Sequence, residues 1–480
     1  MSDLRTETLS GIKWSVVNSV AGRIIGFLLG VILARLLSPS DFGTVGMTAI
    51  FFSLASVLVD SGFSLSLVRK ANITKEDTST VFFFNLVISI IICAVLCLLS
   101  YRIALFLKVP EVEGILKVSA MTLVMGALGS VQFALLTKAV DFKKQAIITL
   151  SAQMLSGVLG IYLAYYGYGV WAIVWQSFAA AAIRTFIVWI VSDWHPNMCF
   201  SISSFKELFG FGGNLAINGL LDIFFRDGTG LIIGKYYTPE QLGFYSRGQS
   251  TAQLPSSFLY GMVGNVTFPV LAKIQDDDER LLLVYRKFMK MFSLIIFFVM
   301  TLLIAVAKPL TIVVFTSKWE DSIVYLQLFC FIYMLYHVHA LNFNYLMVKG
   351  RSDWALKKEL INKGVKFVLL LSLINFGVLY ICIAFCISSV FDIIVNTVVN
   401  GHLFNYGFRK QCSDFIPYLL LSLVCCVPAF ASSYLIDNIY ISLLIGITMP
   451  STIYVSCLLL RKDEVFNELI KITPLRRYIS

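Results

Sequence analysis

The stretch Ala34–Gly43, ARLLSPSDFG, decides the fold, because its design recurs two hundred residues later at Gly234–Gly243, GKYYTPEQLG. In both copies an apolar segment carries a basic residue near its end, and a hydroxyl residue, a proline and a glycine follow at matching positions. A hydroxyl residue before proline favours a turn and stops a helix from continuing. The repeat therefore predicts the same unit twice: a helix, a tight turn and a second helix.

The repeat extends backwards into the preceding helix. Small residues recur there every four positions in the first copy, and four residues stand at the same offsets in the second: Gly22, Gly26, Gly30 and Ala34, against Asp222, Arg226, Gly230 and Gly234. Small residues at this spacing let helix backbones approach closely in a membrane, and such packing explains Gly30 and Gly230. The second copy has exchanged two small residues for charged ones.

The composition is that of a membrane protein. Of 480 residues, 58% are hydrophobic and 14% charged, whereas soluble proteins have roughly 45–50% apolar and about 25% charged residues. Apolar stretches of about 20 residues, enough to cross roughly 30 Å of hydrocarbon, recur along the chain. We predict an all-α integral membrane protein with about fourteen spans, at 11–36, 43–68, 81–105, 115–137, 146–166, 170–192, 209–236, 242–271, 291–308, 322–348, 364–376, 378–404, 415–436 and 439–460.

The repeat also predicts how the spans are grouped. Six spans separate the two copies, and an even number gives both halves the same orientation, related by an axis along the membrane normal. We therefore predict an N-terminal six-helix lobe at 1–200, a C-terminal six-helix lobe at 201–410 and a central cavity between them. Two additional helices and a cytoplasmic tail occupy 411–480.

The basic residues indicate the topology. The formal net charge is +10, and most Lys and Arg residues gather in alternate loops, as at Lys143–Lys144 and Lys357–Lys358. Positive residues mark the cytoplasmic side, so both termini are predicted to be cytoplasmic. Such clusters suit anionic lipid head groups, whereas a nucleic-acid site needs a coherent basic domain with base-reading elements. We predict membrane lipids and no nucleic acid as partners.

Charged residues deep within spans are the candidates for function. Each costs roughly 2.5–3.5 kcal/mol on insertion scales and usually faces a bundle interior or a watery cavity. Arg23 lies about 12 residues into its span, on the order of 18 Å, which places it near the midplane. It is too deep to snorkel to either surface, so we predict that it lines a cavity. The alternative is a buried structural pair with Asp60.

Further charges allow two interpretations each. Asp222 and Arg226 are four residues apart on one helix face, so either they neutralise each other or Arg226 meets the substrate. Asp227 is then left over and points elsewhere. Arg247 lies close enough to the outer surface either to snorkel or to line the cavity, while Arg184 is expected to reach the cytoplasmic interface.

Polar residues in the later spans favour structural roles. Asp392, Asn396 and Asn400 form a stripe at four-residue spacing, for which bonding between helices is favoured over lining a path. His337 and His339 are two apart, so they lie on different faces and form no metal site of the four-residue kind. The ten cysteines show no metal-ligand spacing. We expect no metal, no cofactor and no enzymatic activity.

Several stretches resemble the bacterial polysaccharide transporters, the Wzx-type lipopolysaccharide and colanic-acid flippases of the multidrug/oligosaccharidyl-lipid/polysaccharide exporter superfamily. The longer ones are ARLLSPSDFG at 34–43, VDSGFSLSLVRK at 59–70, GYGVWAIVWQ at 167–176 and IIGKYYTPEQLGFYSRG at 232–248. The shorter ones are Phe268–Pro269, Lys318–Trp319 and Lys349–Arg351. The resemblance covers nearly the whole chain.

The resemblance implies a MATE-like fold of two lobes with alternating access. It also implies a multi-pass protein of the bacterial inner membrane that flips an undecaprenyl-diphosphate-linked oligosaccharide to the outer leaflet, for lipopolysaccharide O-antigen or exopolysaccharide. Related flippases hold the diphosphate with arginines, which suit phosphate oxygens. We therefore predict three substrate-binding arginines and four aspartates for coupling or ion pairs: Arg23, Arg226 and Arg247, with Asp60, Asp222, Asp227 and Asp392. Polymerase and glycosyltransferases of the same pathway are expected partners of a monomer.

Two alternatives stay open. A multidrug extruder of the same fold relies on acidic cation-binding residues, a role open to Asp60, Asp222 and Asp227. A membrane polysaccharide polymerase or acyltransferase is also polytopic, but such polymerases usually carry a long outer loop. The predicted outer loops here are short.

Overall fold

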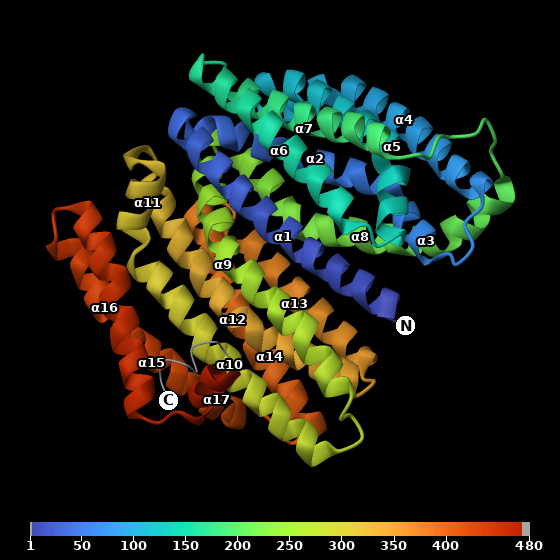
Figure 1. Ribbon diagram of the computed structural model, residues 1–480. Helices are drawn as coiled ribbons and strands as arrows, with labels where there is room; N and C mark the ends of the chain where they lie inside the picture. The colour runs from blue at the N-terminus through green and yellow to red at the C-terminus, as the bar shows by residue number, and fades with distance from the viewer. Residues whose placement is uncertain (1, 473–480) are drawn as a thin grey trace. The chain divides into compact units, whose positions relative to one another are not determined.

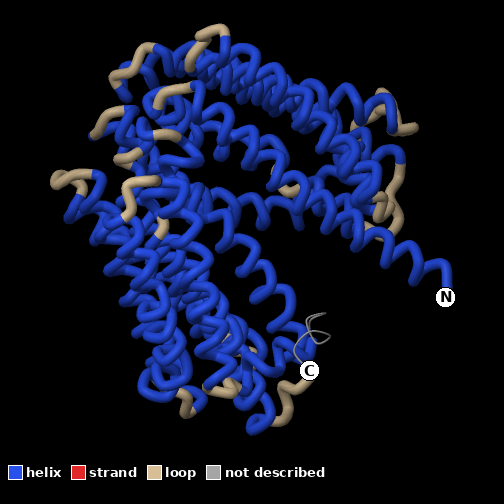
Figure 2. The backbone as a smooth tube through the Cα atoms, turned by 60° about the vertical axis from the view of Figure 1, so that its left-hand side comes forward, coloured by secondary structure: helices blue, strands red, loops and turns tan. Residues whose placement is uncertain are grey.

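The computed structural model describes residues 2–472, and these form seventeen α-helices and one short 3-10 helix (Figure 1). No β-strand occurs in this described range, as the tube in Figure 2 shows. Side chains at a few positions within it, Asp222 among them, lie outside the described residues. The all-α prediction is confirmed.

The chain divides into two compact units, Met1–Gly243 and Phe244–Ser480. The helices of the first unit are α1 Ser2–Leu36, α2 Pro39–Asp60, α3 Phe63–Arg69, α4 Lys75–Leu107, α5 Glu111–Lys138, α6 Phe142–Tyr165, α7 Val170–Val191 and α8 Ile202–Tyr236. Those that follow are α9 Pro239–Ala272, α10 Asp278–Ala305, α11 Ala307–Phe315, α12 Ser322–Val348, α13 Ser352–Leu373, α14 Val378–Phe404, α15 Phe408–Leu435, α16 Ile439–Leu460 and α17 Glu464–Ile472. The predicted lobes 1–200, 201–410 and 411–480 remain a prediction.

Eleven segments of the described chain are long and apolar enough to cross a membrane, counting α2 and α3 as one. Three further helices occupy the predicted seventh, eighth and eleventh spans: α8, α9 and α13, of 35, 34 and 22 residues. A helix of 22 residues is about 33 Å long, which suffices to cross the hydrocarbon. These three are more polar, and they carry many of the intramembrane charges considered below.

The predicted second span is broken in the structure. Ser61 and Gly62 separate α2 from α3, and both have positive φ angles, 43° and 73°. A Cβ on Gly62 would lie against the backbone of Gly212 in α8, so this break needs glycine both for its conformation and for the close approach. The cut predicted at Asn375–Gly377 is confirmed, since α13 ends at Leu373 and α14 begins at Val378.

Helix α10 begins well before the predicted span 291–308. The apolar pattern marks only the part of the helix that lies within hydrocarbon. The helix itself starts at Asp278, and its N-cap residue is Asp277, whose side chain accepts a 3.0 Å hydrogen bond from the Arg280 N–H. Such caps satisfy backbone donors that helix ends leave free. A span predicted from hydropathy is therefore shorter than its helix.

The two repeated turns are built alike. The Ser38 hydroxyl accepts from the Asp41 N–H at 3.2 Å, and the Asp41 carboxylate accepts from the Ser38 N–H at 2.8 Å. Thr238 and Gln241 exchange the same two bonds, both at 3.3 Å. This is the reciprocal capping box, which fixes where a helix begins. The repeat predicted from sequence is confirmed in atomic detail.

The same two turns lie against each other in the first unit. A Cβ on Gly43 would collide with the backbone of Pro239, and a Cβ on Gly243 would collide with the backbone of Pro39. The contact is reciprocal, so each copy of the turn presents its glycine to the proline of the other. Only a residue without a side chain permits this approach.

Helix α8 packs along α2 and α3. A Cβ on Gly234 would meet the Met47 side chain, and the Ser66 hydroxyl donates to the Leu208 carbonyl at 3.0 Å. Beyond the end of α3, Lys70 contacts Asp77 at 2.9 Å and Glu207 at 3.0 Å. The hydrogen bond to Asp77 raises the pKa of Lys70. The first helix of the second repeat thus belongs to the first unit.

A buried carboxylate joins α10 to α15 in the second unit. Asp414 is 3% exposed and accepts from Arg286 Nε at 2.8 Å, from Arg286 Nη2 at 3.0 Å and from the Tyr406 hydroxyl at 2.6 Å. Lys290 lies 3.4 Å away. One anion thereby balances two cations.

We expect Asp414→Ala to destabilise the protein by about 1–3 kcal/mol, because it removes charged hydrogen bonds whose cationic partners are more than a third exposed and keep part of their hydration. Thermal unfolding of the purified protein in detergent measures this, with Asp353→Ala as the control. The exposed carboxylate of Asp353 pairs with Arg351, and its loss should change the unfolding temperature little. Equal shifts in the two variants would contradict the role given to Asp414.

Candidate functional site

Arg23 and Asp60 both lie in the first unit, where no ion pair joins them among the described residues. The Arg23 side chain is exposed on α1, the helix that packs against α6. Asp60 is the last residue of α2 and is half-buried. Its carboxylate accepts from the hydroxyl and the N–H of Ser64, at the start of α3. The alternative of a structural pair between Arg23 and Asp60 is therefore wrong.

Arg226 pairs with its neighbour in sequence. Its Nε lies 3.0 Å from Asp227 Oδ1, and its Nη2 lies 3.3 Å from Oδ2. The expectation that Asp227 has no ion-pair partner and points elsewhere is wrong, because the long Arg226 side chain reaches the carboxylate of this next residue. The Asp222 side chain lies outside the described residues. Since Arg226 remains 60% exposed, the pair leaves its guanidinium accessible.

Arg247, near the start of α9 in the second unit, is held by two aromatic rings. Its guanidinium carbon lies 4.9 Å from the centre of the Phe315 ring and 4.7 Å from that of Trp319. Such cation–π contacts stabilise arginine where it is partly desolvated. Trp319, fully buried, belongs to the Lys318–Trp319 motif noted in the sequence, so the motif residue positions the candidate arginine.

The polar stripe of α14 bonds to neighbouring helices, as predicted. Asn396 Nδ2 lies 3.0 Å from His339 Nδ1 on α12, and Asn400 Nδ2 donates to Asn342 Oδ1 at 2.5 Å. His337 instead meets Ser293 on α10 at 2.9 Å, which confirms that the two histidines face different neighbours. Bonding between helices is thus confirmed for Asn396 and Asn400.

Asp392 lies beside a group of charges that includes Lys358 and Glu359. The expectation that Lys358 belongs to a loop cluster facing lipid head groups is wrong, because this residue lies within α13 and is buried. Lys358 on α13 is 1% exposed, and its ammonium has no hydrogen-bond partner among the described residues. One carboxylate oxygen of Asp392 also lacks such a partner. Glu359 lies 3.8 Å from His339 and 3.5 Å from Lys363. The role of Asp392 in coupling stays a prediction.

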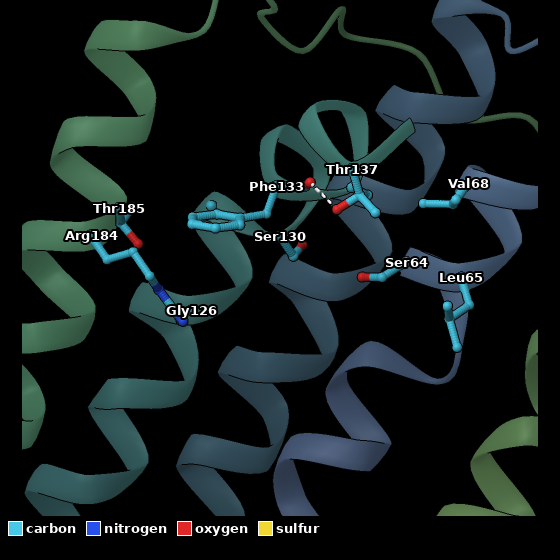
Figure 3. Close-up of a pocket in the computed structure, with 11 residues that line it drawn as sticks. Ser64, Leu65, Val68, Gly126, Ser130, Phe133, Thr137, Arg184 and Thr185 are labelled. Carbon is cyan, nitrogen blue, oxygen red and sulfur yellow. Dashed lines mark hydrogen bonds between the residues drawn. The ribbon is translucent and has the colours of Figure 1, made fainter. Parts of the chain in front are cut away.

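The first unit also contains a cavity of about 310 Å³ between α3, α5 and α7 (Figure 3). Arg184 lines it, together with Ser64, Ser130, Thr137 and Thr185. The sequence analysis predicted only that Arg184 reaches the cytoplasmic interface, and it did not predict this cavity. Small residues on one side of α5, Gly126 and Gly129, leave the space open, and their spacing was the available signal.

Comparison with known proteins places the chain among proteins of polysaccharide biosynthesis. Residues 32–324 match the family described as "Polysaccharide biosynthesis protein". An "Uncharacterized membrane protein in cps region" of Klebsiella pneumoniae is 25% identical over 88% of this chain and 90% of its own. "Lipopolysaccharide biosynthesis protein WzxC" of Escherichia coli is 26% identical, covering 74% and 72%. "Succinoglycan biosynthesis transport protein ExoT" of Rhizobium meliloti is 23% identical, covering 97% and 95%.

Two solved structures share the fold. The lipid II flippase MurJ in its inward closed conformation superposes with a TM-score of 0.76 at 14% identity, covering 95% of this chain and all of its own. An inward-facing multidrug resistance MATE family transporter of the MOP superfamily gives 0.60 at 13% identity, covering 79% and 94%. These likenesses confirm the predicted MATE-like fold. A fold alone does not identify the molecule that a transporter moves.

Proposed function

The chain belongs to the polysaccharide biosynthesis protein family, which its residues 32–324 match, and from that premise we propose that it flips a lipid-linked oligosaccharide. The cargo is an undecaprenyl-diphosphate-linked oligosaccharide, moved from the cytoplasmic to the outer leaflet by alternating access. It serves cell-surface polysaccharide synthesis. Relatives named for lipopolysaccharide and succinoglycan synthesis support this choice.

The observation that carries the proposal is the accessible arginine within membrane helices. The side chains of Arg23 and Arg226 are exposed on α1 and α8, although both lie in predicted spans, and Arg226 stays 60% exposed while paired with Asp227. Charged side chains within spans usually face a bundle interior or a watery cavity, where a substrate can reach them. Arginine binds phosphate oxygens through paired N–H donors, so a diphosphate is a suitable anion. Cationic drugs would be repelled by the same side chains.

The family and the distribution of basic residues support a cellular location, a topology and a set of partners. We propose a bacterial inner-membrane protein with both termini in the cytoplasm, because basic residues gather in the loops assigned to that side. It works as a monomer beside the polymerase and glycosyltransferases of its pathway, and it makes or breaks no covalent bond in its cargo. Since the loops assigned to the outer side are short, they offer little room for a polymerase active site.

The proposal is tested with the purified protein in liposomes that contain a polyprenyl-diphosphate oligosaccharide. A membrane-impermeant glycosidase cleaves only the glycans exposed outside, and we expect the protein to raise the cleaved fraction from about half toward all. A protein-free liposome is the control. An unchanged fraction, together with uptake of a cationic dye by the same liposomes, would favour the multidrug extruder instead.

A further inference from the structure

The cavity at Arg184 lies within the first unit, between α3, α5 and α7. It extends along α5 from Gly126 to Thr137, next to the helix end at Lys138. Eleven residues of helix rise about 16 Å. Under the proposed topology that helix end is cytoplasmic, so the cavity reaches from the inner interface to about the middle of the bilayer. Its volume of about 310 Å³ is at the lower end of the range for small-molecule sites, roughly 300–1,000 Å³.

The charge of the cavity is positive. Among the described residues that line it, Arg184 is the one basic side chain and none is acidic. Figure 3 shows the Arg184 side chain extending from α7 toward Gly126 on α5. The guanidinium lies 5.4 Å from the centre of the Phe133 ring, and within residues 2–472 as described it makes no hydrogen bond or ion pair. Five N–H donors are therefore available to an anion.

The hydroxyl groups around the cavity complement a different part of a ligand. Thr137 donates to the Phe133 carbonyl at 2.9 Å, and Thr185 donates to the Met125 carbonyl at 2.7 Å. Ser130 likewise donates to the Ala127 carbonyl at 2.9 Å, and Ser64 donates to Asp60. Each hydroxyl has used its single proton in these bonds, and Ser130 and Thr137 also accept from the side-chain amides of Asn85 at 3.1 Å and Gln145 at 2.7 Å. Ser64 and Thr185 therefore have two lone pairs to offer a ligand, and Ser130 and Thr137 have one each. They are suited to hydrogen-bond donors on the ligand, not to phosphate oxygens.

We propose that this cavity binds a lipid head group of the cytoplasmic leaflet that combines a phosphate with hydroxyl groups. The phosphate lies on Arg184, and the hydroxyls of the ligand donate to Ser64, Ser130, Thr137 and Thr185. Two lipids carry this chemistry: an anionic phosphoglycerol lipid, and a polyprenyl diphosphate whose first sugar follows the phosphates. Phosphatidic acid has the phosphate without the hydroxyls and should bind more weakly.

Binding is measured by native mass spectrometry of the full chain in detergent, with three short-chain probes: phosphatidylglycerol, phosphatidic acid and a polyprenyl-diphosphate sugar. Arg184→Gln is expected to weaken all three about tenfold or more, as loss of a charged hydrogen bond implies. Thr185→Val should weaken the two hydroxyl-bearing probes and spare phosphatidic acid. Arg102→Ala, which removes an exposed arginine of α4, is the control. Whichever hydroxyl-bearing probe binds tighter identifies the lipid.

A second variant covers the case that Arg184→Gln does not fold. A Cβ on Gly126 meets no atom within 4 Å, so Gly126→Leu fills the cavity without removing its charge, and Gly364→Leu, with equally open surroundings, is its control. Loss of binding in Gly126→Leu alone supports the site. Binding equal to wild type in both Arg184→Gln and Gly126→Leu, or equal loss in the control variants, overturns it. The assay involves no flipping, so its failure is distinguishable from failure of the transport proposal.

Discussion

Replacing Gly43 by leucine is expected to abolish export of the surface polysaccharide. A side chain at Gly43 would collide with the backbone of Pro239, and a backbone cannot move aside as the end of a flexible side chain can. Overpacking a core costs typically about 1–3 kcal/mol, and a backbone collision belongs at the upper end or beyond. The two repeated turns would be forced apart at the point where they meet.

The measurement is polysaccharide export in a strain that lacks the gene and carries each variant, with protein amount determined in parallel. Because the contact is reciprocal, Gly243→Leu should fail in the same way through Pro39. Gly364→Leu is the matched control, since a Cβ there meets nothing within 4 Å. Full export by Gly43→Leu at normal protein levels would show that the contact is dispensable.

The second large effect is expected from Arg23→Ala. If Arg23 holds the diphosphate, its removal loses charged hydrogen bonds worth about 1.5–3 kcal/mol, or roughly 10- to 150-fold in binding. Export should fall accordingly, and the amount of protein in the membrane is measured in parallel to separate loss of binding from loss of folding. Arg23→Lys should restore part of the export, since lysine binds phosphate as a point charge without the paired geometry.

Arg102→Ala is the matched control for this prediction. It removes an exposed arginine of α4, far along the chain from the candidate site, and export should be unaffected. If Arg23→Ala exports as well as wild type, Arg23 does not bind the cargo, and Arg226 and Arg247 become the arginines to test.

The sequence predicts most of the fold because its signals are local. A capping box needs only residues three apart, so Ser38–Asp41 and Thr238–Gln241 follow from the repeat. The length of an apolar run predicts a span without reference to any other helix. The break between α2 and α3 was missed because Ser61 and Gly62 lie inside a run that is apolar on both sides.

The parts that the sequence did not predict depend on contacts between distant residues. The pairing of Arg226 with Asp227 depends on side-chain rotamers, which helix periodicity does not specify. The cavity at Arg184 arises where three helices leave space, and its lining residues are separated by more than a hundred positions. The same holds for Lys358, whose burial follows from how α12, α13 and α14 pack.

Flipping of a lipid-linked oligosaccharide is tested most directly in spheroplasts of a strain from which this gene has been deleted. Lipid-linked glycan that an impermeant glycosidase cannot reach is still in the cytoplasmic leaflet. We predict that such glycan accumulates in the deletion strain, and that wild type relieves the accumulation whereas Arg23→Ala does not. An absence of accumulation, with altered drug resistance in its place, would contradict the proposed function and indicate a multidrug extruder.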